Sequence, residues 1–167
     1  AALRAAVALR SDAIVAGDKA AFMALLDRSD PEFLLEQSRW FDYRLSAEIA
    51  GFSLEVESLI PLGNDESSVG LRQSYLIGPG RDPRDVRYDE RYRKVSGLWL
   101  DADIRFAVFE SEHFTLRYRP SIEPARIMKI SWDAEAAWST VRASYGEAPA
   151  ARTVLKIFDD QELLRQN

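Results

Sequence analysis

The chain has 167 residues, of which 47% are hydrophobic and 29% charged, so it can bury the core of one domain or of one domain plus a fragment. Its 27 acidic and 22 basic residues give a formal charge of −5, which argues against a nucleic acid or an anionic membrane surface as partner. The absence of cysteine excludes disulfide bonds and thiolate metal sites, and it leaves the compartment undetermined.

The sequence contains no apolar run long enough to span a bilayer, so no transmembrane segment is expected. Residues 1–4 lack the uninterrupted apolar stretch of a signal peptide. We therefore expect that any targeting segment was removed or never existed. An exported or cell-surface location stays open.

Two helices are predicted at the start of the chain. The first covers residues 3–16, where apolar residues recur at helical spacing, and it ends at Gly17. Asp18 then acts as the N-cap of a second helix that runs to about Arg28.

A third helix is predicted after Asp30, an N-cap residue followed by Pro31 at the first helical position, and it should end at Gly51. Its apolar stripe is formed by residues spaced three to four apart, flanked by Phe33 and Trp40. The members of the stripe are Leu34, Gln37, Phe41, Leu45 and Ile49.

The period then changes from helical to two, which is typical of half-buried strands. Five strands are predicted: residues 54–60, 69–77, 86–95, 98–104 and 106–109. Ser96-Gly97 is a two-residue hairpin signal between the third and fourth strands. On the third strand, alternation places Val86, Tyr88, Glu90 and Tyr92 on one face.

Residues 3–109 are therefore predicted to form an α+β unit, in which three helices pack on a curved antiparallel sheet. The predicted shared core contains Leu34, Phe41, Leu45, Val56, Leu71, Tyr92 and Leu100.

Three segments in this order resemble a nuclear transport factor 2-like, or SnoaL-like, cone domain: residues 13–18 (Ala-Ile-Val-Ala-Gly-Asp), residues 88–92 (Tyr-Asp-Glu-Arg-Tyr) and residues 97–99 (Gly-Leu-Trp). The resemblance implies a cystatin-like cone, a curved sheet wrapped round a helix with a pocket inside. It implies no reaction, because the fold serves enzymes, adaptors and accessory domains alike.

Enzymes of that superfamily generally use an aspartate, often with a histidine, inside the cone. His113 is the only histidine and lies beyond the expected last strand, so the catalytic candidate that remains is Glu90. Burial among tyrosines would raise the pKa of a carboxyl group toward neutral pH, as a general base requires. The alternative, favoured on general grounds, is that Glu90 pairs with an arginine at the rim of the cone.

A ligand cavity, if the cone has one, is predicted to be lined by seven residues: Trp40, Gln73, Tyr75, Tyr88, Glu90, Tyr92 and Trp99. The competing interpretation is that these aromatic side chains fill the core, which is the commoner fate of buried rings.

Beyond residue 110 the pattern is a strand over 113–118, a long helix from Pro124 to Gly146, a strand over 153–158 and the start of another helix at Asp159. The apolar stripe of the long helix is predicted to contain Ile127, Ile130, Ala134, Ala137, Val141 and Tyr145, with Trp138 beside it.

Three motifs in this region resemble the front of a peptidase MA-like, gluzincin-type metallopeptidase domain. They are Glu112-His113-Phe114 with Tyr118, the helix end Tyr145-Gly146 with Pro149, and the strand that begins at Val154. Only the first third of such a domain would be present.

The zinc motif of that family, His-Glu-x-x-His, does not occur here, so no catalytic residue, metal ligand or cofactor is carried over. The predicted domains are 1–110, nuclear transport factor 2-like, and 111–167, an N-terminal peptidase MA-like fragment.

Two functions follow as hypotheses. The preferred one is a non-catalytic accessory or small-ligand-binding module that precedes a truncated metallopeptidase-like domain. The alternative is a small-molecule lyase or isomerase of the SnoaL-like type with Glu90 as base. The partners considered are a small ligand in the cone, a second copy bound through the sheet, and the downstream peptidase-like domain.

Overall fold

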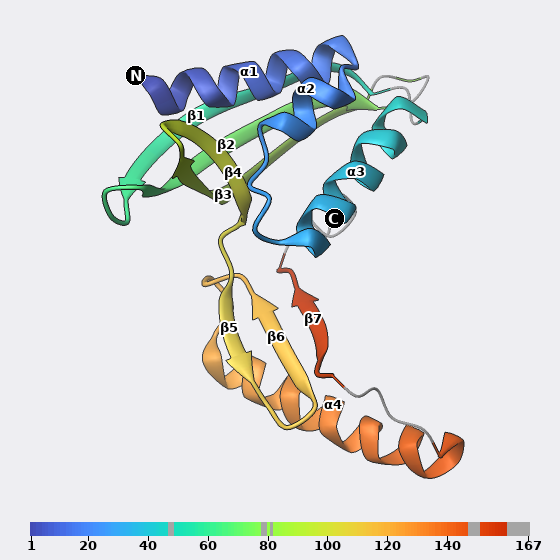
Figure 1. Cartoon of the computed structure of the whole chain (residues 1–167). Coiled ribbons are helices and arrows are strands. Elements are labelled where there is room, and N and C mark those ends of the chain that lie inside the picture. The colour runs from blue at the N-terminus through green and yellow to red at the C-terminus, as the bar shows by residue number, and fades with distance from the viewer. Residues whose placement is uncertain (47–48, 78–79, 81, 147–150, 160–167) are drawn as a thin grey trace. The chain divides into compact units, whose positions relative to one another are not determined.

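The structure is a computed structural model, and it describes residues 1–46, 49–77, 80, 82–146 and 151–159. The described residues divide into two compact units, unit 1 (residues 1–104) and unit 2 (residues 105–159). Each unit has its own sheet (Figure 1).

Unit 1 is an α+β structure, as predicted. Its helices are α1 (Ala2–Ala16), α2 (Lys19–Ala24) and α3 (Pro31–Ser46). Its strands are β1 (Ala50–Pro61), β2 (Glu66–Ile77), β3 (Asp82–Val95) and β4 (Leu98–Ile104). The strands form one curved antiparallel meander in the order β1-β2-β3-β4 (Figure 1).

Helix α1 ends where the sequence predicts, because Gly17 adopts a left-handed conformation with φ of 69°. Its buried face packs toward β1 and β4 and consists of Leu3, Val7, Arg10, Ala13 and Ile14. A charged residue thus lies in the middle of an otherwise apolar face.

Helix α2 is shorter than predicted, ending at Ala24 instead of near Arg28. The chain after it bonds to β4 instead of continuing the helix. The Asp101 amide donates to the Leu25 carbonyl at 2.9 Å, and the Asp27 amide donates to the Asp101 carbonyl at 2.6 Å. These tertiary hydrogen bonds replace the helical ones.

Helix α3 begins as predicted, because the Asp30 carboxylate accepts hydrogen bonds from the amides of Glu32 and Phe33. It ends at Ser46, so Ile49 lies outside it and Gly51 belongs to β1. The predicted stripe is rotated by about one residue: the buried residues are Phe33, Gln37, Phe41 and Arg44.

The predicted core is therefore partly wrong. Phe41, Leu71 and Tyr92 are buried as expected, whereas Leu45 is 53% exposed. Leu34, Val56 and Leu100 are only half-buried. Leu100 pairs with Arg93 on the face of the sheet that points away from Tyr92, which is why it does not reach the core.

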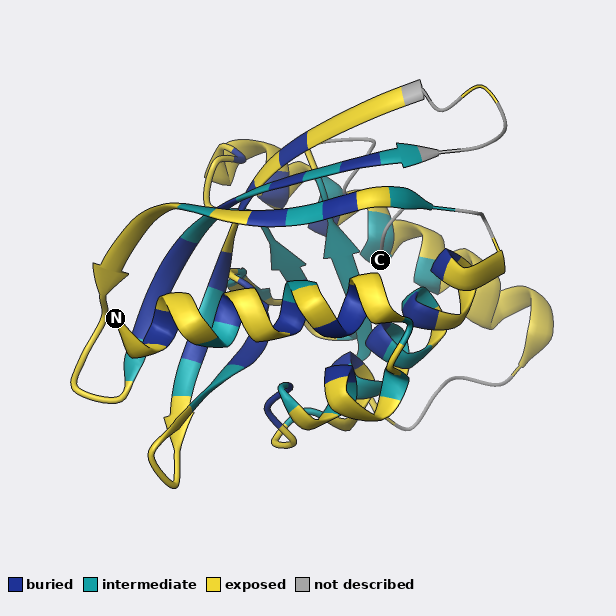
Figure 2. Ribbon diagram, turned by 90° about the horizontal axis from the view of Figure 1, so that it is seen from above, coloured by how far each residue is buried: buried dark blue, intermediate teal, exposed yellow. Residues whose placement is uncertain are grey.

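Strands β2 and β3 follow the predicted alternation: buried residues alternate with half-buried ones over 69–76 of β2 and with exposed ones over 85–90 of β3. Figure 2, coloured by burial, shows bands of buried residues along the strands of unit 1. The β3–β4 turn has positive φ at both Ser96 and Gly97, the geometry that favours a tight hairpin. In β1 the alternation fails after Val56, where a β-bulge shifts the register and leaves Ile60 exposed.

Unit 2 contains β5 (Ala107–Glu110), β6 (Phe114–Tyr118), α4 (Pro124–Tyr145) and β7 (Thr153–Ile157). β5 pairs antiparallel with β6, and β6 pairs parallel with β7 across the α4 connection. The strand predicted at 106–109 therefore exists but belongs to the second sheet. The units divide after Ile104, whereas the predicted domains divide after Glu110.

The core of unit 2 lies between its sheet and the first half of α4. It is built on Phe114, Leu116, Ile122 and Ile127, with Ile130, Ala134 and Trp138 packed against them. Val141 and Tyr145 are 51% and 79% exposed, so the predicted stripe is buried only in its first half. The helix predicted from Asp159 lies outside the described residues.

Candidate functional site

A cluster of charged side chains lies inside unit 1, between α1 and the sheet. Arg10 Nη1 is 2.5 Å from Glu90 Oε2, 3.1 Å from Asp101 Oδ2 and 3.2 Å from Tyr92 Oη. None of these four residues is more than 5% exposed. We call them the Arg10 cluster.

Three elements position this cluster. Arg10 follows Val7 by three residues and so shares the buried face of α1. Glu90 and Tyr92 point to the same side of β3, and Asp101 on β4 lies directly opposite Tyr92. The guanidinium also lies over the ring of Phe22, with Cζ 5.9 Å from the ring centroid.

Burial and mutual charge control the ionisation of the cluster. Burial raises the pKa of Asp101 well above its usual range, and the neighbouring Glu90 charge adds to this while Arg10 opposes it. Burial acts to lower the pKa of Arg10, but Asp101 and Glu90 outweigh it and hold that pKa well above the ordinary value. The pKa of Tyr92 is raised by burial, so its phenol stays neutral.

Two polar atoms of the cluster have no hydrogen-bond partner among the described residues, Arg10 Nε and Asp101 Oδ2. Asp101 Oδ2 is close to Arg10 Nη1 but outside the direction of a hydrogen bond. Its other carboxylate oxygen accepts the amide of Asp103 at 3.1 Å. Asp101 is thus the less well satisfied of the two carboxyl groups.

A chain of aromatic rings crosses unit 1. Phe22 lies 5.0 Å from Phe41 and 5.8 Å from Trp40, measured between ring centroids. Trp40 continues to Phe52 at 6.1 Å, and Phe52 stacks on Tyr75 at 6.5 Å. Trp40 is half-buried, whereas the other four rings are buried.

The seven predicted ligand residues are therefore distributed over four places. Trp40 and Tyr75 belong to the aromatic chain, and Glu90 and Tyr92 to the Arg10 cluster. Tyr88 Oη donates to Gln73 Oε1 at 2.7 Å, so these two satisfy each other. Trp99 lies beside the β3–β4 turn, opposite Lys94. Their role in ligand binding stays a prediction.

Glu90 forms an ion pair with an arginine, Arg10. The pair is enclosed in unit 1 and not at a rim, because Glu90 is 3% exposed. Sequence reasoning missed Arg10 and Asp101. Their signals were a basic residue on the apolar face of α1 and an aspartate on the inward-facing register of β4.

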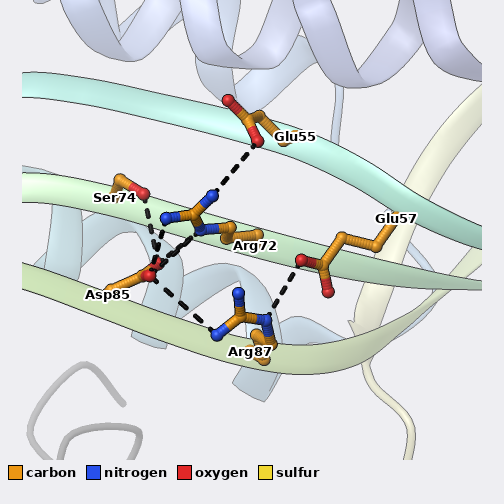
Figure 3. Close-up of polar contacts among 6 residues, drawn as sticks. All are labelled: Glu55, Glu57, Arg72, Ser74, Asp85 and Arg87. Atoms are coloured by element: carbon orange, nitrogen blue, oxygen red, sulfur yellow. Dashed lines mark hydrogen bonds and ion pairs between the residues drawn. The ribbon is translucent and has the colours of Figure 1, made fainter.

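The outer face of the sheet carries a lattice of ion pairs across β1, β2 and β3 (Figure 3). Arg72 Nε bonds to Asp85 Oδ1 at 2.9 Å, and Arg87 Nε bonds to Glu57 Oε1 at 3.0 Å. The hydrogen bond from Arg72 lowers the pKa of Asp85. Their exposure identifies these cross-strand pairs as surface pairs.

His113 lies in unit 2, where the turn after β5 meets α4. Its Nδ1 shares a 2.6 Å hydrogen bond with Glu135 Oε2, and its ring stacks on Trp138 at 4.8 Å. Ser111 Oγ and the His113 amide also donate to Glu135. These hydrogen bonds lower the pKa of Glu135 to about 2, and the one from Ser111 has the largest effect. The predicted strand-end histidine is thus held by α4.

Among the residues that the structure describes, no group of three or more histidine, cysteine, aspartate or glutamate side chains could hold a metal ion. Within the same residues, no helix has both the length and the apolar character needed to cross a membrane.

No family model matches the sequence, and no curated protein is significantly similar to it. Solved structures with nuclear transport factor 2-like or ketosteroid isomerase-like folds do resemble it. A nuclear transport factor 2-like protein of unknown function from Shewanella oneidensis is 13% identical; the match covers 59% of this chain and 89% of that one, with a TM-score of 0.44.

A ketosteroid isomerase-like protein from Erwinia carotovora is 15% identical, with 60% of this chain and 88% of that one covered and a TM-score of 0.45. A protein of ketosteroid isomerase-like fold from Catenulispora acidiphila, solved in complex with trimethylamine, is 14% identical, with coverages of 60% and 84% and a TM-score of 0.45. At these values no residue role or activity is transferred to this chain.

Proposed function

We propose that unit 1 is a non-catalytic accessory module that binds a small, largely apolar ligand, and that Glu90 has a structural role. The observation that carries the proposal is the enclosed pair of Glu90 with Arg10. A general base must come within hydrogen-bonding distance of the proton that it removes. Glu90 is 3% exposed and its carboxylate is already bound by a guanidinium, so it is poorly suited to that task.

The aromatic chain is the better place for a ligand. Trp40 is its half-buried member, and it contacts the rings of Phe22 and Phe52 on either side. Indole and phenyl faces attract apolar and aromatic groups through their large contact area. The Arg10 cluster offers no comparable access, since its members are enclosed.

The test uses the fluorescent dye 8-anilinonaphthalene-1-sulfonate as the probe and the full chain as the protein. We expect saturable binding under conditions in which near-ultraviolet circular dichroism shows native packing. Trp40→Ala should weaken binding about tenfold, the upper range for the loss of one aromatic contact. Trp132→Ala is the matched control, because Trp132 is 71% exposed on α4 in unit 2.

Glu90→Gln should leave the dye affinity within about twofold, since it does not alter the aromatic chain. Absence of saturable binding, or equal loss in the Trp40 and Trp132 variants, would contradict the proposal. A large loss in Glu90→Gln, with native packing intact, would instead favour the lyase or isomerase alternative, in which the carboxylate meets the ligand.

The second part of the proposal concerns unit 2, which we infer to be the N-terminal part of a peptidase MA-like domain. Its support is the order of strand, long helix and strand, present as β6, α4 and β7. The test is the coding sequence that follows the codon for Asn167. A His-Glu-x-x-His motif there would support this part, and a stop codon would contradict it.

A homodimer through the sheet also stays a proposal. The outer face that such a dimer would cover carries the Arg72–Asp85 and Arg87–Glu57 pairs (Figure 3). Burying these charges is costly unless a partner supplies further hydrogen bonds. Sedimentation equilibrium in low and high salt would reveal whether such a dimer forms.

A further inference from the structure

The Arg10 cluster contains more acidic than basic groups. One guanidinium nitrogen, Arg10 Nη1, lies between Glu90 Oε2 at 2.5 Å and Asp101 Oδ2 at 3.1 Å. All three side chains are at most 6% exposed. If both carboxyl groups were ionised, the enclosed group would carry a net negative charge.

No other basic group compensates for that charge among the described contacts of the cluster. Arg93, the neighbour of Tyr92 on β3, lies on the other face of the sheet and pairs with Asp27 at 2.7 Å. Asp103 on β4 is itself buried and adds to the acidic surroundings of Asp101. On β3, Tyr88 and Tyr92 face the cluster as phenols whose pKa values are raised by burial.

A buried charge without a counter-ion is strongly unfavourable, so a buried carboxyl group that lacks its own counter-ion binds a proton instead. We propose that Glu90 and Asp101 hold one proton between them at neutral pH, which makes the interior of unit 1 a proton-binding site with Arg10 fixed between two exchangeable counter-ions. This inference is independent of the proposed ligand.

The geometry places that proton mainly on Asp101. Glu90 accepts the short hydrogen bond from Arg10 and is the better-stabilised anion. Asp101 Oδ2 accepts no hydrogen bond from the described residues, which fits a carboxyl oxygen that carries a proton.

The consequence for stability has a definite sign. A carboxyl group whose pKa is higher in the folded than in the unfolded state stabilises the fold. This stabilisation is fully present below the unfolded pKa of about 4, and it is lost as the pH rises through the folded pKa. The anchoring of α1 on the sheet should therefore weaken on the alkaline side. Asp101→Asn, which mimics the protonated group, should remove that pH dependence.

The two counter-ions should also replace each other. In Glu90→Gln, Asp101 loses its proton and becomes the partner of Arg10; in Asp101→Asn, Glu90 keeps that role. The double variant leaves Arg10 buried without an anion. Breaking a buried pair in this way corresponds to at least a hundredfold loss in the folding equilibrium constant.

The experiment is carbon-13 NMR of aspartate carboxyl groups in the full chain from pH 4 to 9, with the Asp101 signal assigned through Asp101→Asn. We expect the protonated chemical shift at pH 7 in the unaltered protein and a titration displaced to lower pH in Glu90→Gln. Asp85→Asn, which alters a surface pair on the outer face, is the control and should leave the signal unchanged.

An Asp101 signal that titrates below pH 5 in the unaltered protein, or one that does not move in Glu90→Gln, would overturn the proposal. Thermal unfolding adds a second measurement. Each single variant should keep a cooperative transition, and the double variant should lose far more stability than the sum of the two. Additive losses would contradict exchangeable counter-ions.

Discussion

Replacing Phe41 by alanine should strongly destabilise unit 1, whereas the same change at Leu45 should not. Phe41 is fully buried, with its ring 5.0 Å from that of Phe22 and the Arg44 guanidinium 5.7 Å from its centroid. Removing such a ring costs about 3 to 5 kcal/mol through lost transfer energy and the cavity that remains. Leu45 is 53% exposed, so its truncation should change stability by about 0.5 kcal/mol or less.

The assay is native-state amide hydrogen exchange followed by mass spectrometry on the full chain. Peptides from β2 and β3 report the opening of unit 1, and a peptide from β6 serves as internal control for unit 2. Phe41→Ala should reduce the opening free energy of the β2 and β3 amides by the amount given. Equal losses in the two variants, or a loss below about 1 kcal/mol in Phe41→Ala, would refute the assigned face of α3.

Three further predictions concern packing, pH and metals. A Cβ added at Gly70 would lie 2.3 Å from Ser58 Oγ, so Gly70→Ala should lower the urea midpoint and Ser58→Ala should restore much of the loss; lack of rescue would contradict the contact. The pKa of Glu135 is lowered to about 2, so the stability that Glu135 gives unit 2 is present above the unfolded pKa of about 4.5 and is lost as the pH falls toward 2. Hydrogen exchange of the β6 amides should show this loss of stability, and Glu135→Gln should abolish the pH dependence. Finally, we expect no tightly bound zinc, and stoichiometric zinc after chelator dialysis, measured by mass spectrometry, would contradict this.

The sequence predicted strands better than helix faces. On β3, Val86, Tyr88 and Tyr92 share one face, and charged residues occupy the other. A one-residue slip would move the whole set to the other face, so Val86 to Tyr92 could be placed correctly. On α3 the predicted stripe is the more apolar of two stripes that lie one residue apart, yet the other one is buried. The structure buries Phe33 and Arg44. The stem of Arg44 packs on the core with its guanidinium over the Phe41 ring, and Leu45 is left on the exposed side of the helix.

Long-range pairing could not be predicted. The strand over Ala107–Glu110 was identified from its own residues, but its partner β6 was not, so it was assigned to the first sheet. The Arg10 cluster was missed for the same reason, because Arg10 and Glu90 are separated by 80 positions in the sequence. A basic residue on an apolar helix face indicates that a buried partner exists, but not which residue it is.

The central claim is that Glu90 is the enclosed counter-ion of Arg10 and not a base in an open pocket. The most direct measurement is the exchange of the Arg10 guanidinium protons with water, observed by nitrogen-15 NMR at pH 7 and assigned with Arg10→Lys. An enclosed pair predicts resolved Arg10 signals that exchange much more slowly than those of the exposed Arg87. Arg10 protons that exchange as fast as those of Arg87 would show that water reaches Glu90, and would contradict the account.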